Sequence, residues 1–359
     1  MAPISFARGA PAPECLAIDE IAECAKAAVV DGGAPVLLYG PGGGYAPLRE
    51  WIAERHQVEP ARVVITSGSL QGFVFLAEHL VQPGTRVLVE APTYDRPIKI
   101  LQRLGAEIVP IPMDDEGLIP EEIAGDAAFL YTIPTFQNPS GRTLSTERRR
   151  TLVEHAKERG LFVLEDDPYG LVRYEGEAPP SLFELAGGEN VAYSSSFSKT
   201  IAPGLRVGYF VLPPALAKQI EALAVSTYIS PPYLTQATVY EFVRRGNFEP
   251  NLQRISGLLK AQRDAMLESL EEHMPEGTTW SRPEGGYFIW ADLPVDTPSL
   301  ADAEAAGVTF VPGTDFFADG RGGQSMRLAF SAVSPDEIRE GVARLASVLR
   351  GAPAPASTL

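Results

Sequence analysis

Residues 193–208 read YSSSFSKTIAPGLRVG, and they place Lys199 among hydroxyl-bearing side chains. An apolar run that is typical of a β-strand comes just before this stretch, and Arg206 follows seven residues after the lysine. The amine could form a Schiff base with an aldehyde, while Ser196, Ser198 and Arg206 could hold a phosphate. A lysine in a polar surface loop would give the same short pattern, so the rest of the chain has to decide between the two interpretations.

Short apolar runs alternate with helical patterns between about residues 60 and 212. This alternation predicts a mainly parallel β-sheet that is covered by helices on both faces. One of the predicted helices covers residues 146–159. The seven predicted strands are 63–65, 87–89, 108–111, 129–131, 161–164, 191–193 and 207–211.

A long helical region follows at residues 214–274, with a predicted break near 229–232. Three further strands, near 285–290, 308–311 and 326–330, and a closing helix at 335–350 predict a second α/β unit. The predicted organisation is an N-terminal segment of a small domain at 1–35, a large domain at 36–240, the C-terminal part of the small domain at 241–350 and a disordered tail at 351–359.

Polar residues follow four of the predicted strands, at the points where those strands end. They are Ser69, Asn138, Asp166 and Lys199. Each alone is typical of a helix cap or a turn. Because the carboxyl ends of parallel strands meet at one edge of a sheet, where ligands bind, the four together predict a ligand site.

Composition excludes several classes of function. The 359-residue chain has a net charge of −16 and a pI near 4.8, which argues against a nucleic-acid partner. No run approaches the ~18 apolar residues of a membrane span, and no signal segment is present. Cys15 and Cys24 fit reduced thiols better than a disulfide, and the four histidines match no metal-ligand spacing. We therefore expect a cytoplasmic protein with no metal and no membrane partner.

The residues at the strand ends belong to longer motifs that resemble the fold-type-I pyridoxal phosphate enzymes. The resemblance is to the class I and II aminotransferases, in the branch of the 2-aminoadipate and kynurenine aminotransferases, and it covers nearly the whole chain. It implies an α/β fold in which a large domain holds a mainly parallel seven-stranded sheet flanked by helices. A smaller α/β domain would combine the N-terminal segment with the C-terminal third. The motifs are Tyr39-Gly40 with Gly44 and Leu48-Arg49, Thr66-Ser67-Gly68-Ser69, Pro92-Thr93-Tyr94, Asn138-Pro139-Ser140-Gly141, Asp166-Asp167-Pro168-Tyr169, and Ser196-Phe197-Ser198-Lys199 with Arg206.

The resemblance implies a role for each residue around the cofactor ring. Lys199 would hold pyridoxal 5′-phosphate as a Schiff base and move a proton once substrate displaces it. Asp166 would pair with the ring nitrogen and keep it protonated, so that the ring accepts electrons. Tyr169 and Asn138 would donate hydrogen bonds to the ring hydroxyl oxygen, and Tyr94 would stack on the ring face.

The same resemblance implies a phosphate site and a shared active site. Ser196, Ser198 and Arg206 would hold the phosphate together with the Ser69 hydroxyl and the amides after Gly68. Leu70 stands where many relatives have glutamine, but its backbone amide still suits a phosphate. Tyr39 matches a family tyrosine that reaches this site from the neighbouring subunit, which implies a homodimer.

Substrate binding is expected from residues at both ends of the chain. Arg327 matches the family arginine that binds the substrate α-carboxylate, a task that suits a forked guanidinium, and Asn138 lies in the same site. Gly9 matches the segment that approaches this carboxylate. Arg8 occupies a position that is often small in the family, so it is expected either to meet an acidic substrate side chain or to point to solvent.

Three functions remain open from the sequence. The first is transamination between an L-amino acid and a 2-oxo acid. The second is a biosynthetic pyridoxal phosphate enzyme that performs elimination, replacement, decarboxylation or carbon–carbon bond formation, since one fold supports many reactions. The third is a non-catalytic effector-binding domain, as in related transcription regulators, although the acidic charge and the absence of a preceding DNA-binding segment argue against it.

Overall fold

The computed structural model describes residues 3–351. Apart from Gly351, the tail that was expected to be disordered lies outside the described residues. Within residues 3–351, no helix has the length and apolar character that crossing a membrane requires.

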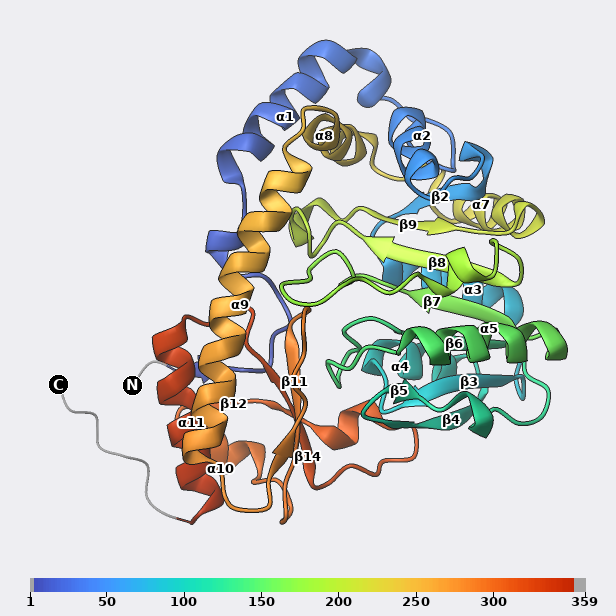
Figure 1. The fold of residues 1–359 in the computed structure, drawn as a ribbon. Coiled ribbons are helices and arrows are strands. Elements are labelled where there is room, and N and C mark those ends of the chain that lie inside the picture. The colour runs from blue at the N-terminus through green and yellow to red at the C-terminus, as the bar shows by residue number, and fades with distance from the viewer. Residues whose placement is uncertain (1–2, 352–359) are drawn as a thin grey trace.

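The large domain is built on one mixed sheet (Figure 1). All seven strands predicted from the sequence are present, and the pairs among β3, β4, β6, β7 and β8 are parallel. β9 runs antiparallel to both β8 and β2, and a short eighth strand, β5, folds back on β4. In spatial order the strands are β2 (Val63–Thr66), β9 (Gly208–Val211), β8 (Val191–Ser196), β7 (Phe162–Asp166), β6 (Phe129–Thr132), β3 (Arg86–Ala91), β4 (Glu107–Asp114) and β5 (Gly117–Leu118).

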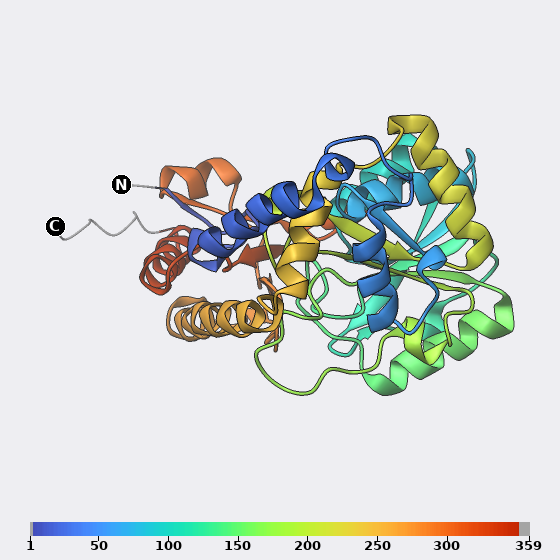
Figure 2. The ribbon, with the colours of Figure 1, turned by 90° about the horizontal axis from the view of Figure 1, so that it is seen from above.

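Helices cover both faces of this sheet, as the parallel strands require (Figures 1 and 2). One face packs against α3 (Ser69–Leu80), α4 (Asp95–Arg103) and α7 (Pro214–Tyr228). The other packs against α2 (Ala46–Arg55), α5 (Thr146–Arg159), α6 (Leu182–Leu185) and α8 (Tyr233–Arg244). The bounds of α5 match the prediction because Ser145 caps its first turn and Gly160 ends it in the left-handed conformation, with φ of 63°.

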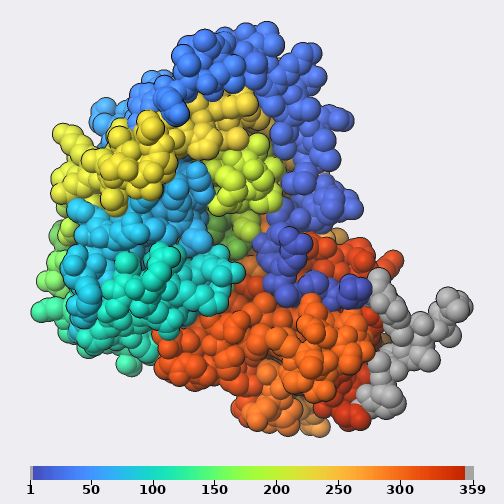
Figure 3. Space-filling model, turned by 180° about the vertical axis from the view of Figure 1, so that it is seen from behind, coloured from blue at the N-terminus to red at the C-terminus, as the bar shows by residue number. Residues whose placement is uncertain are grey.

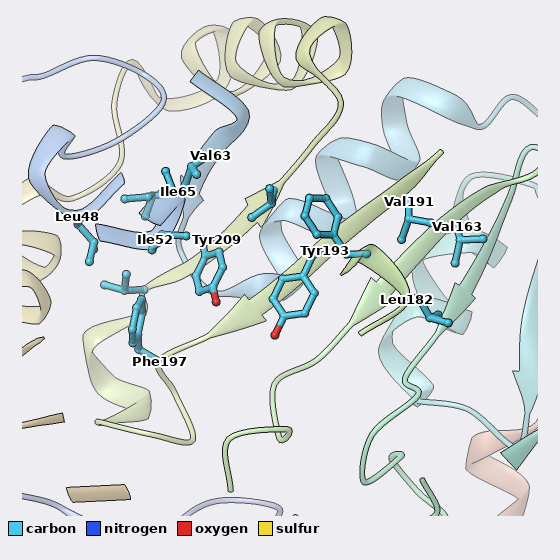
Figure 4. Packing of buried hydrophobic residues seen from close by; sticks show 14 of the residues in the cluster. Leu48, Ile52, Val63, Ile65, Val163, Leu182, Val191, Tyr193, Phe197 and Tyr209 are labelled. Carbon is cyan, nitrogen blue, oxygen red and sulfur yellow. The ribbon is translucent and has the colours of Figure 1, made fainter. Parts of the chain in front are cut away.

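Figure 4 shows the core on the second face. Leu48 and Ile52 of α2 lie beside the rings of Tyr209 and Phe197, and both leucine and isoleucine side chains are fully buried. Burial of one such side chain contributes about 1.5–3 kcal/mol. The strands that carry the site therefore rest on a large apolar layer.

The small domain joins the two ends of the chain. β10 (Thr279–Trp280), β11 (Phe288–Asp292), β14 (Ser325–Ala329) and β13 (Val311–Pro312) form an antiparallel sheet, and β1 (Ile4–Ser5) pairs with β12 (Val308–Thr309). The single strand expected at 308–311 is thus two short strands that belong to different sheets. The helices are α10 (Leu300–Ala305), α11 (Pro335–Leu349) and most of α9 (Phe248–His273).

Two helices connect the domains. α1 (Ile18–Gly32) packs on α8 of the large domain, whereas the residues before it lie against the small domain (Figure 3). α9 begins after a second helix break at Gly246, which the sequence analysis missed and where φ is 77°. Phe248 and Leu252 of α9 belong to the core of the large domain, and Ile255 belongs to the core of the small one.

Candidate active site

The carboxyl ends of β2, β6, β7 and β8 meet at one edge of the sheet and line a cavity of about 340 Å³. Gly9 of the N-terminal segment, Phe288 of β11 and Arg327 of β14 close its other side. The cavity therefore lies between the two domains. Of the residues predicted from the sequence, it brings together Gly9, Ser69, Leu70, Tyr94, Asn138, Asp166, Tyr169, Ser196, Ser198, Lys199, Arg206 and Arg327.

Lys199 lies in the turn after β8, and its amine points into this cavity. Burial, together with the positive charges of Arg327 and Arg206, lowers the pKa of Lys199 to about 8. The amine donates a hydrogen bond of 2.6 Å to the carbonyl of Gly9. A substantial fraction of the amine is therefore neutral near pH 8, which is the nucleophilic form.

Asp166 ends β7 and presents one free carboxylate oxygen. Its Oδ2 accepts a hydrogen bond of 2.8 Å from the hydroxyl of Tyr131, while the buried Oδ1 has no partner in the described chain. Burial raises the pKa of Asp166 to about 6, although the hydrogen bonds from Tyr131 and Ser194 act in the opposite direction. A buried acceptor without a donor is costly, so Oδ1 suits a ligand that brings a proton donor, as a protonated ring nitrogen does.

A cradle of donors lies at the other end of the cavity. The hydroxyls of Ser196 and Ser198 are 2.8 Å apart, and Arg206 donates to Ser198 at 3.4 Å. α3 begins here, directly after its N-cap residue Gly68. Because glycine has no side chain to cap the helix, the backbone amides of the first turn of α3 are available to an anion. A Cβ atom on Gly68 would lie 2.2 Å from Nη2 of Arg206, so only glycine leaves room for this guanidinium.

Three aromatic or amide side chains line the middle of the cavity. Burial raises the pKa of Tyr169 and of Tyr94, so both phenols keep their protons at neutral pH. Tyr169 is fully enclosed and therefore remains a hydrogen-bond donor. Asn138 is also buried, and its Oδ1 accepts a hydrogen bond of 2.9 Å from Arg327.

Arg327 on β14 provides a second anion site. Its guanidinium carbon lies 4.4 Å from the ring centre of Phe288 and 4.9 Å from that of Phe316, so the two rings fix its plane. Nη2 donates to the carbonyl of Ala7 at 2.7 Å, and the buried Nε has no partner in the described chain. A held guanidinium with a free donor suits a carboxylate.

Two predicted residues lie elsewhere. Tyr39 is 80% exposed and Arg8 is exposed, and neither lines the cavity of this chain. Conversely, the hydrogen bond between Tyr131 and Asp166 was not predicted from the sequence. Several lining residues were also not predicted: Asp95, Arg96, Ile133, Pro168, Pro203 and Phe288. Asp95 and Arg96 could have been found, because they follow β3 at the same sheet edge, whereas Phe288 is brought here only by the small domain.

The residues present fit pyridoxal phosphate. One cavity holds an amine of lowered pKa, an unpartnered carboxylate oxygen at Asp166 and a cradle of hydroxyl, amide and guanidinium donors around Ser198. These groups match the aldehyde, the ring nitrogen and the phosphate of that cofactor.

Comparison with known proteins agrees with this geometry. Residues 13–345 match the family of aminotransferases of class I and II. The chain is 37% identical to an aromatic-amino-acid aminotransferase of Thermococcus litoralis, over 97% of this chain and 88% of the relative, and 37% identical to a 2-aminoadipate transaminase of Thermus thermophilus, over 97% and 90%. The crystal structure of an alpha-aminoadipate aminotransferase from Thermus thermophilus, complexed with N-(5′-phosphopyridoxyl)-L-leucine, is similar with a TM-score of 0.93 and 36% identity, over 97% of this chain and 92% of that one.

The family match spans most of the chain, and both relatives are aligned over nearly their whole length. Lys199 and Asp166 both line the cavity at the edge of the sheet. The chain therefore belongs to the class I and II aminotransferases, pyridoxal phosphate-dependent enzymes that transfer an amino group between an amino acid and a 2-oxo acid.

Proposed function

We propose that Lys199 carries the cofactor as a Schiff base and that Asp166 holds its ring nitrogen. The observation that carries this assignment is the unpartnered Oδ1 of Asp166 in the same cavity as the Lys199 amine. When bound, the cofactor supplies an electron-poor ring that stabilises negative charge at the substrate Cα. Asp166, Ser198 and Arg206 then fix its orientation from opposite ends.

Lys199 also provides the proton transfer. Because its pKa is lowered to about 8, Nζ of the released lysine can take a proton and return it without a large energetic penalty. The rings of Tyr169 and Tyr287 lie 5.7 and 5.1 Å from Nζ and limit where the amine can move. These neighbours keep Nζ on one side of the cavity, as a single proton carrier requires.

Arg327 binds the α-carboxylate of the substrate in this proposal. Its orphaned Nε and its contacts with Asn138 and Ala7 support the assignment, because they leave the guanidinium held but not saturated. The rings of Phe288 and Phe316 lie 4.4 and 4.9 Å from its guanidinium carbon and shield it from water. The carboxylate would thus be oriented before the reaction at Cα.

We also propose that the enzyme is a homodimer in which Tyr39 completes the partner's phosphate site. Leu37, Leu38 and Tyr39 are 60%, 66% and 80% exposed, which is unusual for three consecutive apolar side chains. Val225 and Ile229 of the adjacent α7 region are exposed as well, and Gly40 contacts Ser230 at 3.4 Å. A continuous apolar surface next to Tyr39 supports burial against a second copy.

The relatives' names suggest the substrates to test. Aromatic amino acids and 2-aminoadipate are named for the two relatives, so we propose an L-amino acid from one of these classes as the donor. Cys15 and Cys24 are buried and free of a disulfide, which suits the reducing cytoplasm in which we place the enzyme.

The test is to load the protein with pyridoxal phosphate, reduce it with borohydride and map the modified peptide. In the wild type, we expect the reduced cofactor to be attached to Lys199. In Lys199→Ala, we expect the visible absorbance of the Schiff base to be absent. An adduct on another lysine, or an unchanged spectrum in this variant, would disprove the assignment. Formation of a 2-oxo acid from each donor, with 2-oxoglutarate as acceptor, then identifies the substrate.

A further inference from the structure

Glu90 is a buried carboxylate beside the active site to which no role has been assigned above. It is the penultimate residue of β3 and is 2% exposed. Burial raises the pKa of Glu90 to about 7, and three hydrogen bonds act in the opposite direction. The donors are Thr132 Oγ1 at 2.5 Å, the amide of Ile133 at 3.1 Å and Nε2 of Gln137 at 2.9 Å.

Gln137 connects this carboxylate to two walls of the cavity. Its Nε2 also donates to the carbonyl of Pro92 at 2.8 Å, two residues before Tyr94. Its Oε1 accepts from the amide of Ser140 at 2.8 Å and so closes the loop that contains Asn138. All polar atoms of the Gln137 side chain are thereby used within the protein.

We propose that Glu90 is a positioning residue, which orients Asn138 and Tyr94 by holding Gln137 between their two loops. The proposal rests on the proposed function for the roles of Asn138 and Tyr94. The path is short: Glu90 bonds Gln137, Gln137 precedes Asn138, and Asn138 bonds Arg327. One carboxylate thus supports both the ring-stacking side chain and the arginine for the substrate carboxylate.

A carboxylate suits this position because all its neighbours are donors. The oxygens of Glu90 accept from a hydroxyl, a backbone amide and a side-chain amide. Glutamine at position 90 has one acceptor oxygen in place of two, so it cannot accept from Thr132, Ile133 and Gln137 together as the carboxylate does. Glu90→Gln therefore retains the volume and weakens the contacts that hold Gln137.

The first experiment measures amide hydrogen exchange in the cofactor-free protein. We expect residues 133–141 to exchange about 10-fold faster in Glu90→Gln than in the wild type, because the loop loses its anchor. Gln137→Leu should speed exchange of the same residues by a similar factor. The double variant should exchange about as fast as either single variant, since both substitutions act on one contact. Glu241→Gln is the matched control, because Glu241 is buried in α8 and bonds Arg244 and Arg245 away from the site.

The second experiment uses the loaded enzyme. Glu90→Gln should raise the KM for the amino donor about 10-fold, with a smaller effect on kcat, because Arg327 loses a fixed partner in Asn138. It should also shift the pH at which the visible spectrum of the bound cofactor changes, whereas Glu241→Gln should not.

The outcomes separate the two proposals. The role of Glu90 would be overturned if, in both Glu90→Gln and Gln137→Leu, residues 133–141 exchange at the wild-type rate and the cofactor spectrum changes at the wild-type pH. Absence of cofactor absorbance in the wild type would instead overturn the proposed function, and the exchange of residues 133–141 would still decide the role of Glu90. If Glu90→Gln does not fold, Gln137→Leu makes the same test with Glu90 in place.

Discussion

The hydroxyl of Tyr131 donates a hydrogen bond of 2.8 Å to Oδ2 of Asp166, and this bond leaves Oδ1 as the free oxygen. The two residues lie at the ends of the neighbouring parallel strands β6 and β7. Their relative position is therefore set by the sheet, which is more rigid than a loop. Tyr131 is 1% exposed, and its pKa is raised well above the usual value by burial and by Asp166, so it stays a donor.

The pKa of Asp166 is about 6 in the wild type, and the hydrogen bond from Tyr131 lowers it. Tyr131→Phe removes this bond and should therefore raise the pKa of Asp166 above about 6. The acid limb of the pH profile of kcat/KM should then move upward by about one pH unit, since one unit corresponds to about 1.4 kcal/mol. The profile is measured with a single donor from pH 5 to pH 9. An acid limb at the wild-type position would contradict this reading of the contact.

A shared active site predicts complementation between two defective subunits. Lys199→Ala should have no activity, and Tyr39→Ala should bind the cofactor at least about 10-fold more weakly through loss of a phosphate contact. In a hybrid dimer, one site combines the intact Lys199 of one subunit with the intact Tyr39 of the other. Unfolding, mixing and refolding of the two variants should therefore restore activity at limiting cofactor.

The control for this experiment mixes Lys199→Ala with Asp166→Ala, because both defects belong to the same proposed site of one chain and their hybrid contains no intact site. Equal activities in the two mixtures, or a monomer by light scattering, would count against the shared site.

The stability of the cofactor-free protein should fall as the pH rises from 5 to 7. Burial raises the pKa of Glu90 and of Glu165 to about 7 and that of Asp166 to about 6, so the folded chain binds more protons than the unfolded chain in this window. His56 opposes this trend, because burial lowers its pKa to about 4 and the unfolded chain then holds the extra proton. Three acids against one histidine leave a net loss of about 2 kcal/mol per pH unit near pH 6.

Urea unfolding at several pH values measures this slope, and Glu90→Gln should make it shallower because one of the three acids is removed. A free energy of unfolding that rises steadily between pH 5 and pH 7 would show that the buried acids do not have raised pKa values.

Arg96 should influence the choice of substrate. It lines the cavity with 57% of its side chain exposed, and its Nε lies 3.6 Å from Asp95. Lys199, Arg206 and Arg327 already have proposed partners, so Arg96 is placed to meet a second carboxylate. Arg96→Gln should lower the ratio of kcat/KM for a dicarboxylic over a monocarboxylic 2-oxo acid about 10-fold. Lys99→Gln, which also removes a charge beside Asp95 and lies outside the cavity lining, should leave the ratio unchanged.

The sheet was predictable because each of its strands is a short apolar run between turns, and a strand buried on both faces needs such a run. β5 was missed because two residues carry no periodicity. The strand at 308–311 was predicted as one because the change of partner at Phe310 depends on β1, which comes from the other end of the chain.

The clustering of the candidate cofactor residues was predictable for a different reason. Ser69, Asn138, Asp166 and Lys199 each follow a strand, so topology alone places them at one edge. Arg96 follows a strand in the same way and was overlooked. The contact of Tyr131 with Asp166 was hidden, since the apolar run of β6 identifies a buried tyrosine but not the partner of its hydroxyl. The phenylalanines around Arg327 depend on how the small domain closes, which no local pattern encodes.

α9 connects the small domain to the turn that carries Lys199. Its 26 residues extend over about 39 Å, and near its start Asn251 donates to the carbonyl of Thr200 at 2.6 Å, one residue after Lys199. A rotation of about 5° around this point would displace the far end by about 3 Å over the remaining length of the rod. Any such tilt of α9 would be felt at the turn that carries Lys199 through the hydrogen bond of Asn251, so the small domain is coupled to the catalytic residue by one amide group.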